Sequence, residues 1–395
     1  MKILAYLTKK GHTALSENML SLVNALFNMG HAVKLCDVNN NDEACGVFSS
    51  LLEDPNCFDM SVGFNSLGLE WKIAGNTDML HLYDALIFPH VSIMVDEPFN
   101  HYVSGYDLPC RNHIVTYIDR SDLKALDILY PDKKMKKLFM PLGGTLNENI
   151  SEPLSAHKEY DVVVSAGNWV AGTTLPQWRQ EGIKKSIAVI LDDVANVLMN
   201  YLVSLLPAFQ EVLYARGMYD KEYLEILSPF FWLVLQYIKP WRRHRMVQCL
   251  VEAGFKVHIF GGGWEQAPFH GELIDHGAVS YREMLDVISK TKVLVQDEAL
   301  FNDGAHDRVF TGMLNGAVVV SEYSSYLDEL FDDGQDLFMF DWQHTKEQME
   351  VIHQLISDEH YRTEIAGNAY TKVIKSQTWR NRAERIIEAV DIVRQ

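Results

Sequence analysis

A short polar turn between Asp303 and Arg308 carries the residue types in this chain that are best suited to chemistry. It reads Asp-Gly-Ala-His-Asp-Arg, and a helical run from about Arg308 to Asn315 follows it. The apolar stretch 317–320 comes next, which is typical of a buried strand. The free N–H groups and the dipole at the start of a helix attract negative charge. A cation and a histidine at that position therefore indicate a phosphate-binding turn and predict a nucleotide-type ligand.

Three consecutive glycines form a second candidate loop. Gly261, Gly262 and Gly263 follow the strand-like stretch 256–260 and precede Trp264. Because glycine has no side chain, its backbone can approach a phosphate or a sugar closely. We therefore predict a ligand loop here, with a flexible turn as the alternative. Trp264 is a candidate for stacking on a sugar ring, although large aromatic side chains more often belong to the core.

Strands and helices alternate around these loops, beginning in the first 40 residues. The stretch 2–7 is a short apolar strand, 16–29 has its apolar residues at helical spacing, and 32–36 starts the next strand. This βαβ opening predicts a parallel sheet. Further strands are expected at 60–64, 85–88, 91–95, 114–117 and 138–141. We expect residues 1 to about 155 to form one doubly wound, Rossmann-like domain.

A second Rossmann-like domain is expected over residues 156–375. It begins with a strand at 161–165 and contains a mostly helical insertion near 176–238. After Pro240 the pattern predicts, in order, a helix at 242–253, a strand at 256–260, a helix at 281–289 and a strand at 293–296. The last segment, 376–395, is expected to be a helix that packs back on the N-terminal domain.

The predicted fold class is therefore α/β, with two Rossmann-like domains that face a central cleft. In open parallel sheets the ligand binds beyond the carboxyl ends of the strands. Three loops are expected to converge there: Thr8–Thr13 with Gly11 and His12, Gly261–Trp264, and Asp303–Arg308. For the first of these loops, a turn in solvent is an equally good explanation.

Composition and charge exclude several classes of function. The chain has 395 residues, 48% of them hydrophobic and 22% charged, so it should bury large cores. Its net charge of −18 argues against a nucleic-acid partner, because phosphate backbones need a basic footprint. Five scattered cysteines without a CxxC pair argue against zinc and favour reduced thiols in a cytoplasmic protein. No motif in the sequence indicates a metal site.

Two apolar stretches, 194–215 and 224–238, raise the question of a membrane. Polar residues and a proline interrupt both, and neither supplies the roughly 20 apolar residues that span a bilayer. The first apolar run of the chain ends after five residues, which is too short for a secretion signal. We expect core helices in a cytoplasmic protein, with peripheral membrane association or a protein partner as the alternative.

Five segments of the second half of the chain occur in an order that resembles a known family. They read FGGGWE (260–265), HGAVSYREM (276–284), DGAHDRVFTGMLNGAVVVSE (303–322), LDELFDDGQDLFMFD (327–341) and TWRNRAERI (378–386). Together they resemble the C-terminal half of a GT-B glycosyltransferase, most of all the group 1 branch related to spore-maturation glycosyltransferases. The resemblance covers about residues 240–390, and the N-terminal half is similar only in general form, through SVGFNSLG (61–68) and IMVDEPFNHY (93–102).

The resemblance implies a nucleotide-sugar donor in the C-terminal domain and an acceptor mainly in the N-terminal one. The residues that would lie against the base of the donor are Val279, Ser280 and Tyr281. Those that would face its sugar and pyrophosphate are Asp303, Gly304, His306, Asp307 and Arg308. Many retaining relatives carry a glutamate pair in an E-x7-E pattern. Here Asp303 takes the first position and Thr311 the second, so the sequence does not decide between retention and inversion.

Sugar transfer requires stabilisation of the leaving diphosphate, which preorganised cations can supply. His306 and Arg308 suit this role. The alternative for Arg308 is a surface ion pair with Asp303 or Asp307.

The acceptor also needs a general base, which the resemblance places in the N-terminal domain. Asp96 follows the strand-like stretch 91–95, and a carboxylate near the sugar site can take the proton of the acceptor as a general base. His12 and Glu97 are rivals for this role. A local contact of Asp96 before Pro98 is the alternative reading.

These predictions describe a metal-independent glycosyltransferase of the hexosyl type that needs no cofactor beyond its nucleotide-sugar substrate. The acceptor would be a glycan or a protein, and the helical segment 176–238 is a candidate platform for it. A GT-B-like nucleotide-sugar epimerase with Glu97 and Asp303 in its cleft stays open. So does a non-catalytic nucleotide-sugar-binding or assembly subunit, which Thr311 favours. An NAD-dependent dehydrogenase is disfavoured, because no GxGxxG follows the first strand.

Overall fold

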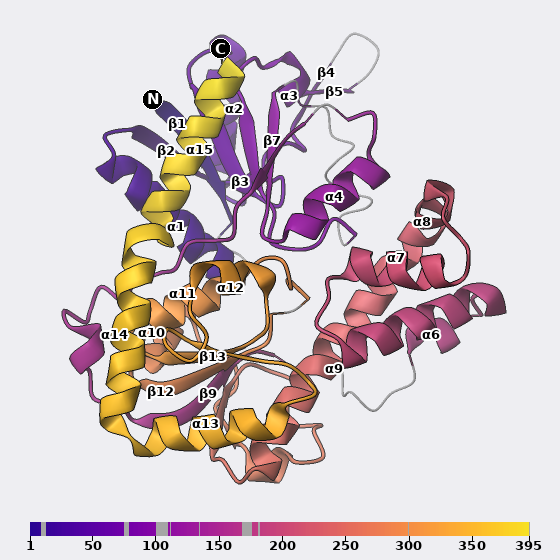
Figure 1. Ribbon diagram of the computed structural model, residues 1–395. Coiled ribbons are helices and arrows are strands. Elements are labelled where there is room, and N and C mark those ends of the chain that lie inside the picture. The colour runs from indigo at the N-terminus through magenta and orange to yellow at the C-terminus, as the bar shows by residue number, and fades with distance from the viewer. Residues whose placement is uncertain are drawn as a thin grey trace. The chain divides into compact units, whose positions relative to one another are not determined.

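Two compact units make up the chain in the computed structural model (Figure 1). The first comprises Met1–Gly143 together with Thr378–Gln395, and the second comprises Gly144–Gln377. The structure describes residues 1–8, 13–74, 79–99, 110, 112–133, 135–167, 176–180, 182–298 and 300–394. Gly11 and His12 lie outside these described residues.

A parallel six-stranded sheet forms the centre of the first unit, in the order β2-β1-β3-β6-β7-β8. Its strands are β1 (Lys2–Leu7), β2 (Ala32–Asp37), β3 (Met60–Phe64), β6 (His90–Ile93), β7 (His113–Tyr117) and β8 (Lys136–Phe139). β1 lies between β2 and β3, with Ile3 opposite both Val33 and Met60. Since the chain winds away from β1 in both directions, the switch point of this sheet lies between β1 and β3.

Helices and a small antiparallel pair of strands complete the first unit. They are α1 (Thr13–Asn28), α2 (Asn41–Glu53), β4 (Lys72–Ala74), β5 (Met79–His81), α3 (Leu82–Ala85), α4 (Arg120–Leu129) and α15 (Trp379–Arg394). The last of these, α15, packs against α1. Arg385 on α15 donates a hydrogen bond to the carbonyl of Phe139 at 2.7 Å. The C-terminal helix is therefore part of the same unit as the N-terminal sheet.

The second unit has its own parallel sheet, in the order β11-β10-β9-β12-β13-β14. Its strands are β9 (Tyr160–Ser165), β10 (Val257–Phe260), β11 (Ile274–Asp275), β12 (Thr291–Gln296), β13 (Val318–Glu322) and β14 (Phe338–Phe340). β9 comes first along the chain and lies at the centre, with Val163 opposite His258 on one side and Leu294 on the other. The winding reverses between β9 and β12, which makes their carboxyl ends the switch point.

Helices pack on this second sheet and form a separate helical layer beside it (Figure 1). They are α5 (Gln177–Gln180), α6 (Lys185–Asn200), α7 (Leu205–Ala215), α8 (Lys221–Leu227), α9 (Phe231–Glu252), α10 (Tyr281–Ser289), α11 (Asp307–Leu314), α12 (Ser325–Leu330), α13 (Thr345–Ser357) and α14 (Glu359–Ser376). Within the described residues, no helix is both long enough and apolar enough to cross a membrane.

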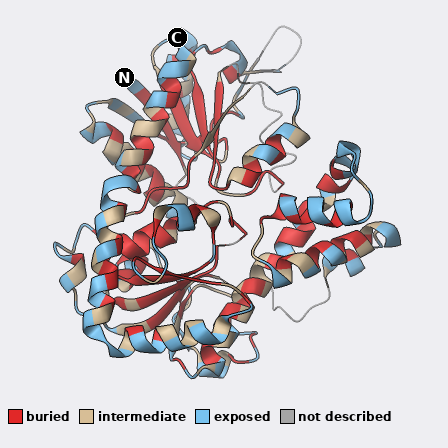
Figure 2. Ribbon diagram, viewed as in Figure 1, coloured by how far each residue is buried: buried red, intermediate tan, exposed pale blue. Residues whose placement is uncertain are grey.

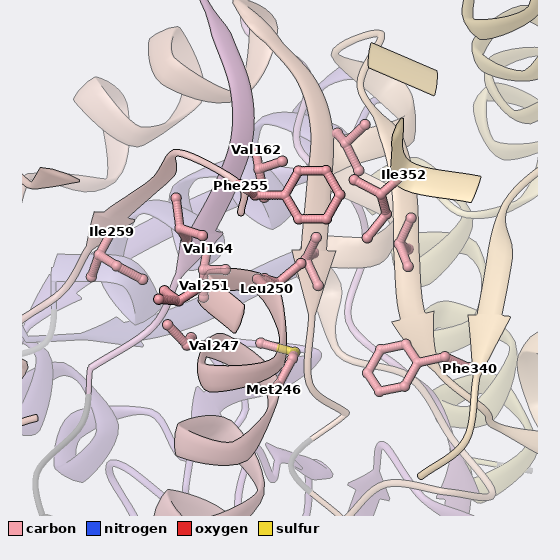
Figure 3. Close-up of a cluster of buried hydrophobic side chains, with 14 of the residues drawn as sticks. Val162, Val164, Met246, Val247, Leu250, Val251, Phe255, Ile259, Phe340 and Ile352 are labelled. Atoms are coloured by element: carbon pink, nitrogen blue, oxygen red, sulfur yellow. The ribbon is translucent and has the colours of Figure 1, made fainter. Parts of the chain in front are cut away.

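The core of the second unit lies between its sheet and the helices α9 and α13. Strand residues such as Val162 and Val164 meet Leu250 from α9 and Ile352 from α13, and all four are buried (Figure 3). β12, β13 and β14 are buried along nearly their whole length (Figure 2), because helices cover the sheet on its faces, whereas the edge strand β11 is exposed. The β12 sequence Thr-Lys-Val-Leu-Val-Gln is correspondingly apolar in its middle.

Two predicted elements differ from the structure. The helix expected to start at Arg242 begins at Phe231 and runs through Pro240. Proline removes one helical hydrogen bond, but buried residues on both sides of it hold the helix together. The strand expected at 85–88 is also wrong: α3 ends at Ala85 and the following residues are irregular. Ile87 is largely exposed, so this apolar run does not enter the sheet.

Candidate functional site

The end of β9 is the point where several charged and aromatic side chains of the second unit meet. Each of three consecutive backbone carbonyls there accepts a hydrogen bond from a different part of the chain. The pairs are Arg308 to Ser165, Trp264 to Ala166 at 2.8 Å, and Arg243 to Gly167 at 2.5 Å. These donors come from α11, from the loop after β10 and from α9. The switch point of the sheet is thus fixed by donors from three elements.

Arg308 connects the two strands at the switch point. Its Nη1 donates to the carbonyl at the end of β9, and its Nε donates to the side-chain oxygen of Gln296, the last residue of β12, at 2.8 Å. The side chain is half-buried. Burial lowers the pKa of its guanidinium somewhat, and the nearby Asp297 acts in the opposite direction. Arg308 therefore places a fixed positive charge at the edge where an open α/β sheet binds its ligand.

His306 caps the helix that carries Arg308. Its Nδ1 accepts the backbone N–H of Arg308 at 3.3 Å and also lies 2.6 Å from Oδ1 of Asp307. The first contact requires an unprotonated Nδ1, whereas the second is strongest when Nδ1 carries a proton. Burial lowers the pKa of His306, and the charge of Arg308 lowers it further. The neutral, capping form is therefore favoured at pH 7.

A second arginine approaches the same edge from α9. Arg243 holds the buried carboxylate of Asp297 with two hydrogen bonds, from Nε to Oδ1 at 3.1 Å and from Nη2 to Oδ2 at 2.9 Å. Burial alone would raise the pKa of Asp297, but the charge and hydrogen bonds of Arg243 outweigh it and lower that pKa to about 2. Asp297 is consequently ionised in the folded protein, and Arg243 is its counter-ion.

Two further carboxyl groups lie beneath the turn, and both are fully buried. Glu298 accepts hydrogen bonds from the Ser321 hydroxyl at 2.7 Å and from the His306 backbone N–H at 2.8 Å. Glu322 accepts the backbone N–H of Glu298 at 2.9 Å. Burial raises the pKa of Glu298 to about 8 and that of Glu322 to about 7. These groups therefore titrate near neutral pH, unlike ordinary surface carboxylates.

The remaining residues of the predicted turn are held by the chain after β13. Asp303 accepts a hydrogen bond from Ser325 Oγ at 2.8 Å, and the carbonyl of Gly304 accepts one from Ser324 Oγ. Asp307 is buried beside His306. The turn from Asp303 to Arg308 is thus anchored to the ends of β12 and β13, as a preorganised site requires.

The glycine loop lies at the same edge and packs directly on the end of β9. The N–H of Gly261 donates to the carbonyl of Gly277 at 2.8 Å. Its φ of 154° and its position allow no side chain, since an added Cβ would lie 2.3 Å from the carbonyl oxygen of Ala166. Gly262 and Gly263 follow, both half-buried.

We expect Gly261→Ala to lower the free energy of unfolding by about 1–3 kcal/mol, because the new Cβ must displace backbone at the switch point. Chemical unfolding measures this loss. Gly271→Ala is the matched control, because its Cβ would enter open space; its effect should stay within about 0.5 kcal/mol. Equal stabilities of the two variants would contradict the packing described here.

Trp264 is completely buried, with an exposed fraction of 0%. Its ring belongs to the main core cluster of the second unit, and its indole N–H bonds the end of β9. No face of the ring is accessible for stacking on a sugar in this structure. What Trp264 does here is position the end of β9.

The segment predicted to lie against a nucleotide base is beside the glycine loop, through the bond between Gly277 and Gly261. Ser280 caps α10 in a capping box: its Oγ accepts the Glu283 N–H at 3.3 Å, and Glu283 accepts the Ser280 N–H at 2.8 Å. Val279 and Tyr281 on either side are half-buried.

Thr311, at the second position of the E-x7-E spacing, is buried inside the second unit. Its Oγ1 accepts the backbone N–H of Thr145 at 3.2 Å. The side chain at this position therefore holds the first segment of the unit in place.

In the first unit, Asp96 is half-buried in the loop after β6, and Glu97 beside it is buried. His12 and Gly11 lie outside the described residues. The structure thus groups the predicted residues of the second unit at one sheet edge, while Asp96 belongs to the other unit. Among the described residues, no three histidine, cysteine, aspartate or glutamate side chains come together to hold a metal ion.

Four charged residues of this edge were not predicted from the sequence: Arg243, Asp297, Glu298 and Glu322. Asp297, Glu298 and Glu322 stand at the ends of apolar strands. The same sequence signal predicts the turn at 303–308, so it identifies these three residues as candidates too. Arg243 gives no such signal, because it lies within a helix and reaches the site through a contact across 54 positions of sequence.

Residues 242–388 match the protein family described as glycosyl transferase-like. Among solved structures, a T4 phage protein, a BGT mutant in complex with UDP-glucose, has a TM-score of 0.55 at 11% identity, over 99% of this chain and 100% of that one. An alpha-glucosyltransferase in complex with UDP has a TM-score of 0.53 at 10% identity, over the whole of both chains. HepE of Anabaena in complex with UDP and glucose has a TM-score of 0.51 at 12% identity, over 99% of each chain. No curated protein sequence matches the chain.

These similarities define the fold as that of the GT-B glycosyltransferases, with two parallel-sheet, Rossmann-like domains. The predicted α/β fold class is therefore confirmed. At these sequence identities the similarity establishes the fold, and the chemistry must be argued from the site.

Proposed function

We propose that the protein is a glycosyltransferase that moves a sugar from a nucleoside-diphosphate sugar to an acceptor. The observation that carries the proposal is the pair of arginines, Arg308 and Arg243, fixed at the switch point between β9 and β12. This is the edge at which open α/β sheets bind nucleotides. The match of residues 242–388 to glycosyl transferase-like proteins and the UDP or UDP-glucose in the three similar structures support the same ligand class.

In the proposed reaction, the bond between the sugar C1 and the diphosphate oxygen breaks and a bond from C1 to an acceptor oxygen forms. Negative charge develops on the leaving diphosphate, and Arg308, with the start of α11, would stabilise it. Arg243 would add to the positive potential, although Asp297 neutralises much of its charge. We propose that this stabilisation is metal-independent, with the arginines as the only cations required.

The acceptor proton would pass to a carboxylate, for which Asp96 stays our candidate and Glu97 its rival. We propose a hexosyl donor and a glycan or protein acceptor, with the helices α6 to α8 as a platform for it. We also propose a place in the spore-maturation-related branch of these enzymes. A cytoplasmic location is supported by five free cysteines: Cys36, Cys45, Cys57, Cys110 and Cys249.

The test is a panel of UDP-, GDP- and dTDP-sugars, each incubated with the protein with and without EDTA. We expect one donor class to be hydrolysed slowly to its diphosphate without an acceptor, and EDTA to leave the rate unchanged. Calorimetric titration with UDP, GDP and dTDP should show binding of the matching nucleotide.

The alternatives give different outcomes in the same panel. Conversion of a donor into another nucleotide-sugar, without release of diphosphate, would identify an epimerase. Binding without any turnover would identify a non-catalytic subunit. Failure to bind any of the three nucleotides would contradict all of these functions.

A further inference from the structure

Glu298 and Glu322 form a buried carboxyl pair at the ends of two neighbouring strands, β12 and β13. Both side chains have an exposed fraction of 0%. The backbone N–H of Glu298 bonds one oxygen of Glu322, and the side chain of Glu298 bonds the backbone N–H of His306. The pair therefore connects β13 to the turn that presents His306 and Arg308.

The cations near this pair do not offset the charge of both of its carboxyl groups. Arg242 on α9 comes within 3.9 Å of Glu322. It donates, however, to the backbone carbonyls of Leu198 and Tyr201 and to the side chain of Asn302. Arg243 on the same helix is the counter-ion of Asp297. Arg242 thus offsets the charge of one carboxylate at most, and ionisation of both Glu298 and Glu322 would leave negative charge uncompensated in the interior, which is strongly unfavourable.

One atom of the pair is left without a hydrogen bond. Oε1 of Glu322 is buried and has no hydrogen-bond partner among the described residues. Burying an ionised carboxylate oxygen without a hydrogen-bond donor costs more free energy than burying a neutral carboxyl group, because the neutral group has no charge to desolvate. The geometry, like the raised pKa values of both groups, favours a proton on the pair at neutral pH.

The backbone between the pair and the turn is strained. Leu300 is buried and has a φ of 76°, a conformation that bulky residues rarely adopt. Such a conformation persists only where surrounding contacts hold it. One such contact is the hydrogen bond that the backbone N–H of Phe301 donates to the carbonyl of Glu298 at 2.8 Å.

We propose that Glu298 and Glu322 carry one proton between them, on one carboxyl or the other, beneath the His306–Arg308 turn, and that binding of the donor diphosphate is coupled to proton uptake by this pair. The ligand rests on the proposed function. A diphosphate near Arg308 adds negative charge close to the pair and makes its ionisation less favourable. By thermodynamic reciprocity, the protein binds the diphosphate more tightly when the pair is protonated than when both carboxyl groups are ionised.

The charged and titratable groups facing the pair leave one rival source of a proton. Asp297 is held ionised by Arg243, and Arg242 and Arg308 stay charged throughout the neutral range. His306 is the rival, because a bound phosphate favours its protonation as well. His306→Asn removes this rival and serves as one control.

The test is calorimetric titration with UDP at pH 8 in two buffers of different ionisation enthalpy, which counts the protons taken up. Wild-type protein should take up a fraction of a proton per UDP bound, and its affinity should fall by up to about 10-fold per pH unit above pH 8. Glu298→Gln should bind UDP without proton uptake and with little pH dependence. His306→Asn and the exposed control Glu350→Gln should keep the uptake.

Each outcome decides a separate point. UDP binding without proton uptake in wild type, or uptake that persists in both Glu298→Gln and Glu322→Gln, overturns the inference. If UDP, GDP and dTDP all fail to bind, the proposed function falls and the coupling with it. Whether the pair holds a proton is then tested separately, in the protein without ligand.

The ligand-free test is stability against pH. A carboxyl whose pKa is raised on folding keeps its proton where the unfolded chain has lost it. The contribution of Glu298 to the wild-type unfolding midpoint should therefore fall as pH rises from about 5 to 8. Glu298→Gln should flatten this dependence, and an unchanged slope would show that no proton is held there.

Discussion

Replacement of Arg308 by alanine is expected to lower the rate of sugar transfer by about 10²–10³-fold, which corresponds to about 3–4 kcal/mol of transition-state stabilisation. The physical reason is the position of its guanidinium, which bonds the ends of both strands at the switch point. A charge fixed there needs no reorganisation when negative charge develops on a leaving diphosphate. The measurement is kcat and KM with the donor that the nucleotide-sugar panel identifies.

Two further variants separate this role from a merely structural one. Arg308→Lys keeps the charge but lacks the planar guanidinium that donates to Ser165 and Gln296 from two separate nitrogens, so it should recover only part of the rate. Arg380→Ala removes an exposed arginine of α15 and should leave the rate unchanged. Unfolding curves must show that the Arg308 variants are folded. Full activity of a folded Arg308→Ala protein would remove Arg308 from the mechanism.

The sequence predicts those elements whose stability is local. β1, β3 and α10 have the bounds expected from the residues alone. The two strands are apolar runs between polar residues. The helix starts at Ser280 with a capping box, which satisfies its first N–H groups with side chains only three positions apart. In such segments the pattern and the packing agree.

Elements decided by distant contacts are less accessible to sequence reasoning. Pro240 ends a helix by its own propensity, yet α9 continues through it because Leu235 and Ile238 before it are buried as fully as Val247 after it. The apolar run at 85–88 shows the opposite case, since Ile87 faces solvent. Propensity is a weak guide wherever tertiary burial acts against it.

The site shows the same division between local and distant information. The turn at 303–308 and the glycine loop were predicted because they follow apolar strands. Trp264 is a candidate for sugar stacking or for the core from its sequence alone, and only the structure shows that its ring is fully buried in the core. Arg243 was missed because its partner Asp297 is distant in sequence and no spacing rule joins a helix interior to a strand end.

The buried pair of Arg243 and Asp297 leads to the largest expected effect on stability. We expect Arg243→Met to lower the free energy of unfolding by about 3–5 kcal/mol, because it leaves Asp297 as an uncompensated charge in the interior. Urea unfolding at pH 7 measures the loss. The double variant Arg243→Met with Asp297→Leu removes both charges and should recover most of it, since apolar pairs of similar volume often replace a buried ion pair without cost.

The pH dependence of the single variant provides an independent check with a definite sign. In the wild type, Arg243 lowers the pKa of Asp297 to about 2, so the carboxylate contributes stability at neutral pH that is lost only as the pH falls towards that value. Without Arg243, burial raises the pKa of Asp297, and the folded variant takes up a proton more readily than the unfolded chain. The loss in free energy of unfolding of Arg243→Met relative to wild type should then be larger at pH 7 than at pH 4.5.

An exposed ion pair provides the control. Removing Glu384 from the exposed pair that it forms with Arg380 should lower the free energy of unfolding by no more than about 1 kcal/mol. A similarly small, pH-independent loss in Arg243→Met would mean that solvent reaches Asp297 and that the edge of the sheet is not the dry, preorganised site described here.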